Sequence, residues 1–289
     1  MQRQDLIPVC VAYIFTLAGA YAALDFFNYG PLLDGFLADL VGTVLIFLFG
    51  RFYNNASFYD AYWSVIPPLL AVYWACEAVS EAVDPTRQWL VIALVTYWAV
   101  RLTANWAWHW PGLSHEDWRY QPIRDKAGKW ALWADFSGIH LFPTLIVFAA
   151  CLPIYAAVSL GEAPLNWLDY VAALVTFGAI TLEMIADLQL HRFAKNKQTG
   201  DIIKTGVWQY SRHPNYLGEF GFWLGLMLFG LAAYPQGWWW MIPGALAMLA
   251  MFVYVSIPLM DERSCMRRKN YAAHMEAVPA LFPRLFFKK

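Results

Sequence analysis

Charged side chains are scarce in this sequence, and the motifs of common soluble cofactor sites are missing. Only 14% of the 289 residues are Asp, Glu, Lys or Arg, whereas a soluble globular domain typically carries about 25%. The sequence has no GxGxxG pattern after a strand, no Walker phosphate loop and no HExxH helix. These absences argue against a soluble Rossmann, P-loop or metalloprotease enzyme.

Cysteine and histidine are too dispersed to form a metal site. The four cysteines stand singly without a CxxC pair, and the six histidines show no tight ligand spacing. Neither a disulfide framework nor a zinc site is therefore predicted. No basic arm favours nucleic acid as a partner, and nothing in the sequence implies a protein partner.

Apolar residues dominate instead. They make up 60% of the chain, and the mean hydropathy is +0.41. Eight apolar stretches are each about 18–25 residues long, the length that a helix needs to cross about 30 Å of hydrocarbon. These stretches are residues 7–27, 33–50, 58–76, 88–107, 138–159, 166–190, 216–234 and 238–260. Because helices are the open-chain solution for backbone polar groups in lipid, the sequence predicts an all-α polytopic membrane bundle. We expect one domain over residues 1–289 with seven or eight spans.

Basic residues are distributed asymmetrically between the predicted loops. If both termini and the even-numbered loops share one side, that side holds every Lys and Arg except Arg87, out of 20 in total. Cytoplasmic loops are the basic ones, so both termini are expected in the cytoplasm, with the protein in a bacterial inner membrane. The first span is too long, and lacks a clean cleavage site, for a signal peptide.

Three groups of polar residues stand in or beside the apolar stretches at the basic side. Asp60 begins the third stretch, and Glu183 and Asp187 are four residues apart in the sixth. In the run SRHPNYLGE, four-residue spacing puts three side chains on one helix face: Ser211, Asn215 and Glu219. Ionisable groups in membrane helices usually face a cavity or a partner. A polar pocket that opens to the cytoplasm is therefore predicted.

Structural roles for these residues also stay open. Glu183 and Asp187 also suit ion pairs that lock helices together, and Asp60 suits a helix N-cap. Ser211 and Pro214 fit the start of a helix, but this does not explain Asn215 on the same face as Glu219.

The sequence resembles a known family in four places. These are TGVWQYSRHPNYLGEFGFWLG with the tail YAAHMEAVPALFPRLF, NNASFYDAYWSVIPP, WAVRL with EDWRY, and EMIADLQLHRF. Together they resemble the steroid 5-alpha-reductase and sterol-reductase superfamily, in particular its uncharacterised bacterial branch, over roughly residues 50–289. Isoprenylcysteine carboxyl methyltransferases belong to the same superfamily and share an RHPxYxG signature.

The resemblance implies that NADPH reduces a carbon–carbon double bond of a steroid-like or other isoprenoid or lipid substrate. Most of the implied cofactor contacts lie in residues 166–289. The implied cofactor-binding residues are Arg101, Asp187, Ser211, Arg212, His213, Asn215, Tyr216, Glu219, Arg263, Arg267 and Tyr271. Arginines suit the phosphates of such a dinucleotide.

The implied catalytic residues depart from the family pattern. Steroid 5-alpha-reductases use a glutamine–glutamate pair on one helix and a tyrosine on the next, whereas this chain has Tyr59 and Asp60, then Tyr97 or Trp98. We interpret Asp60 and Tyr97 as the pair that polarises the substrate and donates a proton. The shorter Asp60 favours an enone or alkene lipid other than a 3-oxo-steroid. The alternatives are an S-adenosylmethionine-dependent methyltransferase and a non-catalytic lipid-binding protein.

Overall fold

The computed structural model describes residues 5–283, which form helices and contain no strand. The all-α prediction is confirmed for this range. Arg3, Arg284, Lys288 and Lys289, which the charge pattern assigned to the cytoplasmic side, lie outside the described residues. The α-helices are α1 (Leu6–Phe26), α2 (Pro31–Phe52), α3 (Tyr62–Cys76), α4 (Pro85–His109), α5 (Tyr120–Ala127), α6 (Ala131–Ala134), α7 (Phe142–Tyr155), α8 (Trp167–Asn196), α9 (Pro214–Ala233), α10 (Trp238–Met251), α11 (Ile257–Arg267) and α12 (Tyr271–Ala277).

Several of these helices join into longer rods through π-helical turns. The turn Asp135–Leu141 links α6 to α7, Ala156–Leu160 extends α7, and Phe252–Ser256 links α10 to α11. Within residues 5–283, seven helical stretches are long and apolar enough to cross a membrane. They are Leu6–Phe26, Pro31–Phe52, Pro85–His109, Tyr120–Leu160, Trp167–Asn196, Pro214–Ala233 and Pro235–Arg267. The protein is therefore an integral membrane protein.

The third predicted span is shorter than expected. Residues 58–76 were predicted to cross the membrane, but α3 begins only at Tyr62 and has 15 residues. At about 1.5 Å per residue it is roughly 22 Å long, less than the hydrocarbon core. The chain before it forms a 3₁₀ turn, Ala56–Phe58, in which the Asn55 side chain accepts a hydrogen bond from the Ser57 amide. α3 contacts α2, α4 and α7. It is therefore a short helix that packs inside the bundle, in addition to the seven membrane-spanning stretches.

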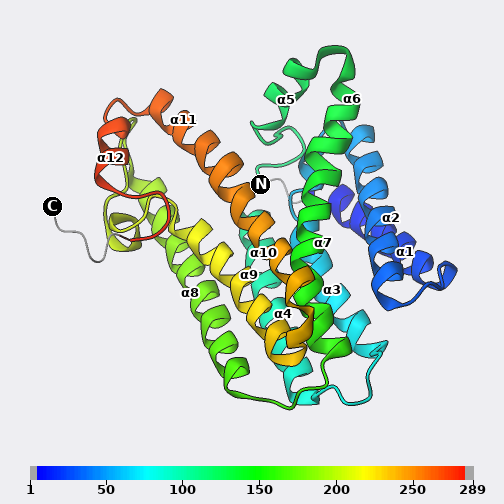
Figure 1. Ribbon diagram of the computed structural model, residues 1–289. Helices are drawn as coiled ribbons and strands as arrows, with labels where there is room; N and C mark the ends of the chain where they lie inside the picture. The colour runs from blue at the N-terminus through cyan, green and yellow to red at the C-terminus, as the bar shows by residue number, and fades with distance from the viewer. Residues whose placement is uncertain (1–4, 284–289) are drawn as a thin grey trace.

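α4 and α8 run parallel and are clamped together at both ends. At one end Arg87 is fully buried and binds Asp169 through two hydrogen bonds of 2.7 and 2.8 Å. At the other end His109 Nε2 lies 2.9 Å from His191 Nδ1. The α5–α6 segment, α11 and α12 project at the end that holds the histidines, which we call the upper end (Figure 1).

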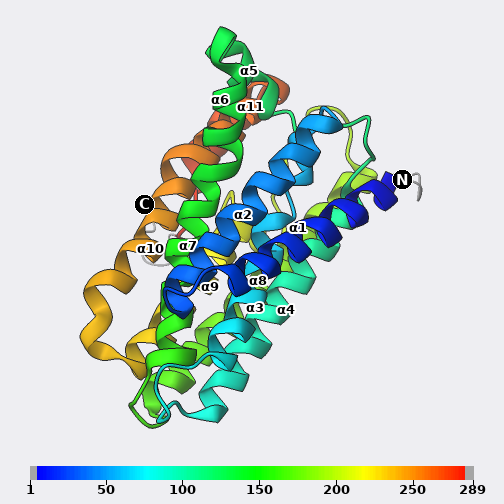
Figure 2. The same cartoon turned by 90° about the vertical axis from the view of Figure 1, so that its right-hand side faces the viewer.

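Both ends of the described chain lie at the upper end. The amide of Leu113, just after α4, donates to the Asp5 carboxylate before α1. The amides of Arg212 and His213 donate to the carbonyls of Pro279 and Ala280. The α1–α2 hairpin lies along the outside of the bundle, beside α3 (Figure 2).

Glycines allow α9 to approach α8 closely. A Cβ on Gly225 would lie 2.1 Å from Thr176 Oγ1 and 2.9 Å from the Thr176 amide nitrogen. On Gly218 it would lie 2.8 Å from the Ala179 carbonyl oxygen. Small residues at such crossings are typical of packed membrane helices. This contact holds α9 close to α8 and so fixes the position of Glu219, the residue after Gly218.

We expect Gly225→Ala to lower the stability of the protein by about 1–3 kcal/mol, because the added methyl group overlaps the α8 backbone. The matched control is Gly178→Ala on α8, where a Cβ would meet nothing within 4 Å. Thermal unfolding in detergent measures both variants. Equal melting temperatures for the two would contradict this account of the helix crossing.

Candidate functional site

Two adjoining cavities lie in the upper half of the bundle. The basic cavity has a volume of about 450 Å³ and is lined by Lys197, Arg212, Arg268 and four histidines. The apolar cavity has a volume of about 440 Å³ and lies among α3, α4, α7, α9 and the α10–α11 rod. Five residues line both cavities and form the wall that they share: Asn105, Asp187, Asn215, Tyr216 and Met260.

A cluster of buried charges fixes this shared wall. Arg101 of α4 forms ion pairs with Glu183 and with Asp187 of α8, the latter at 2.9 Å. The Asn105 side chain also donates to Asp187 at 3.1 Å. Arg101 lines neither cavity. The implied contact between Arg101 and a cofactor phosphate therefore does not fit its position, because its guanidinium lies outside both cavities and is buried against two carboxylates.

Glu219 of α9 lies beside this cluster and lines the apolar cavity. Its two carboxylate oxygens accept hydrogen bonds from the indoles of Trp98, at 3.0 Å, and Trp223, at 3.1 Å. These contacts join α9 to α4 and hold Glu219 in one position. Asn215, one turn earlier, lines both cavities, and its side chain has no hydrogen-bond partner among residues 5–283.

The first part of the SRHPNYLGE run holds the C-terminal tail. The Ser211 hydroxyl donates to the Ala280 carbonyl at 2.9 Å, and Ser211 lines neither cavity. Arg212, His213 and Tyr271 do line the basic cavity. Each of the three also binds the same carboxylate, that of Asp261, at 2.7–3.0 Å.

Asp261 was missed by the sequence analysis. It is buried in α11 and joins the start of α9 to α12. In the sequence it belongs to the charged run DERSCMRRK, which looks like a solvated helix end. The one available signal was an acid directly before a cluster of basic residues.

The predicted arginines of α11 do not reach the cavities, but their neighbour does. The Arg263 guanidinium lies over the Trp118 ring at 3.9 Å, and Arg267 is exposed to the outside. Arg268 lines the basic cavity and donates to the Ser264 hydroxyl at 2.9 Å. α11 ends at Arg267, and the change in backbone direction there turns the next side chain toward the cavity.

Tyr97 faces away from the cavities, contrary to the predicted role. Its side chain is 39% exposed, its ring stacks on Phe177, and its hydroxyl lies 3.8 Å from the Met184 sulfur. The next residue, Trp98, is rotated by about 100° on the helix and takes the buried position instead. Tyr97 is therefore placed on the outer surface of α4.

Asp60 does line the apolar cavity, and its partner is Tyr120. The Tyr120 hydroxyl donates a hydrogen bond to the Asp60 carboxylate. Asp60 precedes α3, outside the membrane-spanning segments. Burial raises the pKa of its carboxyl to about 6, although the hydrogen bond from Tyr120 lowers it. Tyr120 belongs to the EDWRY stretch, one of the four places in which the sequence resembles the reductase superfamily.

The raised pKa makes a prediction about stability. Because the folded state favours the protonated Asp60 carboxyl, this group stabilises the folded protein. The stabilisation is fully present below about pH 4 and is lost as pH rises through about 6. At about 1.36 kcal/mol per pKa unit, this amounts to about 3 kcal/mol. In denaturant titrations at pH 4–7, wild type should lose this amount relative to Asp60→Asn. The exposed Asp125→Asn is the control. A constant difference between wild type and Asp60→Asn at every pH would contradict the prediction.

Comparison with known proteins identifies a family. The family described as "Protein of unknown function (DUF1295)" matches residues 46–278. An uncharacterised protein of Schizosaccharomyces pombe is 25% identical over 283 residues, which cover 90% of this chain and 82% of that protein. No solved structure matches the chain. The matched region contains every residue that lines either cavity, and the chain belongs to the DUF1295 family.

Proposed function

We propose that this protein is a membrane oxidoreductase in which NADPH reduces a carbon–carbon double bond of an isoprenoid or other lipid. One observation carries the proposal: the basic cavity and the apolar cavity meet at a common wall. A charged nucleotide in the first and an apolar molecule in the second would touch at Asp187, Asn215 and Tyr216. A two-substrate reaction between a polar and a lipid reactant requires such an arrangement.

The residues of the basic cavity suit a phosphorylated nucleotide. Lys197 and Arg268 supply positive charge, whereas the charge of Arg212 is offset by Asp261 at 2.7 Å. Asn215 has an unused amide, and Ile202 and Trp208 offer apolar surface to a base. Bound there, NADPH would supply the hydride. The basic upper end would then face the cytoplasm, in the inner membrane of a bacterium.

Asp60 and Tyr120 are the groups that we assign to the proton transfer. Negative charge develops on the substrate during reduction, and a hydrogen-bond donor in a water-poor site stabilises it. The Tyr120 hydroxyl and the protonated Asp60 carboxyl both line the apolar cavity. With a pKa of about 6, Asp60 keeps a protonated fraction near neutral pH and is suited to donate the proton.

The apolar cavity is also accessible from the lipid. Its lining includes Phe142 of α7, Val255 of the π-helical turn and Leu259 of α11. All three side chains are also exposed on the outer surface of the bundle. We assign the substrate entrance to the space between α7 and the α10–α11 rod.

One feature favours the methyltransferase alternative. The Asp187 carboxylate lies on the shared wall, where it would suit the ammonium group of S-adenosylmethionine. The cationic side chains of the basic cavity would repel the positive sulfonium group of S-adenosylmethionine. We therefore prefer the reductase function.

A ligand that binds only the folded state raises the melting temperature. We expect NADPH to stabilise the detergent-purified protein, and S-adenosylmethionine to have no effect, in parallel thermal-shift titrations that also include NADH. Stabilisation by S-adenosylmethionine alone would replace the reductase with a methyltransferase. No shift with any of these ligands would favour a non-catalytic lipid-binding protein.

Variants at two adjacent arginines distinguish cofactor binding in the basic cavity from general attraction to this positively charged surface. Arg268→Gln should weaken NADPH binding by about tenfold or more, because a charge-assisted hydrogen bond contributes about 1.5–3 kcal/mol. Arg267→Gln removes the same charge one residue away, from an exposed side chain, and should change affinity less than about threefold. Equal losses for both variants would contradict this placement of the cofactor.

A further inference from the structure

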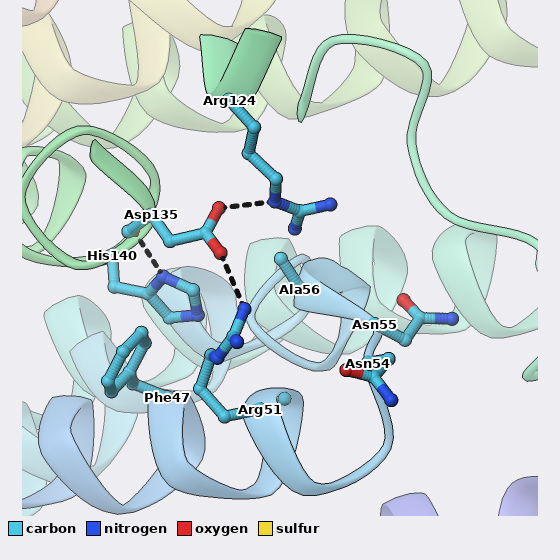
Figure 3. Close-up of a pocket in the computed structure, with 9 residues that line it drawn as sticks. Phe47, Arg51, Asn54, Asn55, Ala56, Arg124, Asp135 and His140 are labelled. Carbon is cyan, nitrogen blue, oxygen red and sulfur yellow. Dashed lines mark hydrogen bonds and ion pairs between the residues drawn. The ribbon is translucent and has the colours of Figure 1, made fainter. Parts of the chain in front are cut away.

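A third, smaller cavity opens at the upper end of α2. Its volume is about 90 Å³, and it is lined by Arg51, Asn55, Arg124 and His140, among others (Figure 3). A single water molecule needs roughly 10–15 Å³ of such space, so the cavity has room for a small polar group such as a phosphate. None of its lining residues belongs to either of the cavities of the proposed reaction.

Two arginines flank one buried carboxylate in this cavity. Arg124 Nε donates to one oxygen of Asp135 at 2.6 Å, and Arg51 Nη1 donates to the other at 3.2 Å (Figure 3). Arg124 is fixed further by two hydrogen bonds to Glu116, at 2.6 and 2.7 Å. The Arg51 side chain is 45% exposed and uses one nitrogen for this ion pair. Its remaining donors are available to a ligand.

His140 presents an unpartnered acceptor to the same space. Its side chain is 1% exposed, and its Nδ1 lies 2.9 Å from the Asp135 carbonyl oxygen. A carbonyl oxygen only accepts, so Nδ1 carries the proton and Nε2 of the neutral ring is an acceptor. Nε2 is buried without a hydrogen-bond partner among residues 5–283 and points toward the Arg51 guanidinium (Figure 3). A buried acceptor left unpaired is costly.

The surroundings of the cavity place it at a membrane interface. Arg51 is in the last turn of α2, and the next residue, Phe52, is 79% exposed. Trp130 and Trp133, just before Asp135, are exposed as well. Exposed aromatic residues beside basic ones are typical of the depth at which lipid headgroups lie.

We propose that this cavity binds a phosphodiester that carries a hydroxyl group, as in the headgroup of phosphatidylglycerol. The phosphate would bind the free donors of Arg51, and a headgroup hydroxyl would donate to His140 Nε2. A soluble glycerol phosphate offers the same two groups. The exposed apolar residues around the cavity favour the lipid as the source.

Native mass spectrometry of the detergent-purified full chain tests the site with equal amounts of phosphatidylglycerol and phosphatidylcholine. We expect wild type to retain phosphatidylglycerol at least tenfold more strongly. Arg51→Gln should lose most of this preference, whereas Lys129→Gln, an exposed lysine outside the cavity, should keep it. Equal retention of the two lipids by wild type, an unchanged Arg51→Gln, or equal losses in both variants would each overturn the site.

Two further ligands test the hydroxyl contact and the source. Phosphatidylethanol has the same charge as phosphatidylglycerol but lacks the headgroup hydroxyls, so it should bind several-fold more weakly. Equal binding would overturn the role of His140. Glycerol 1-phosphate at millimolar concentration should not displace the lipid, and displacement would assign the site to a soluble phosphate ester instead. Neither readout depends on NADPH or on a reductase activity.

Discussion

Buried ion pairs between α4 and α8 fix how these two central helices are arranged. In hydrocarbon no water is available to an ion, so an unpaired charge is far more costly than a paired one. Arg87 with Asp169 and Arg101 with Asp187 each join α4 to α8, the first near the start of α4 and the second in its second half. Two such clamps on one helix pair leave little freedom in its register. Both cavities open against this fixed pair of helices.

The same pairing decides which residues remain for chemistry. Arg101 is neutralised by Glu183 and Asp187, and Arg212 by Asp261. These arginines hold the structure together, and the positive charge left in the basic cavity comes from Lys197 and Arg268. In a membrane protein, an arginine in a motif is therefore as much a candidate for helix pairing as for phosphate binding.

Hydropathy and charge were enough to predict an all-α membrane bundle, because length and apolarity alone determine what can cross a bilayer. Side-chain direction was not predictable at the same level. Tyr97 and Trp98 are adjacent, and only the packing of α4 against α9 decides that the indole is buried. The break after Arg267 and the contact between Tyr120 and Asp60 likewise depend on tertiary structure. No local sequence pattern encodes a contact between residues 60 positions apart.

The loop before α3 connects the two functions that we propose. Asn55 and Ala56 line the small interfacial cavity, whereas Asp60, a few residues later, lines the apolar cavity. The Ala56 amide donates to Glu116 at 2.7 Å, and Glu116 is held in turn by Arg124. The loop that carries Asp60 is thus held by Arg124, which also lines the cavity proposed for the headgroup. A lipid bound there would stabilise the loop, and through it the geometry of Asp60, without touching the substrate.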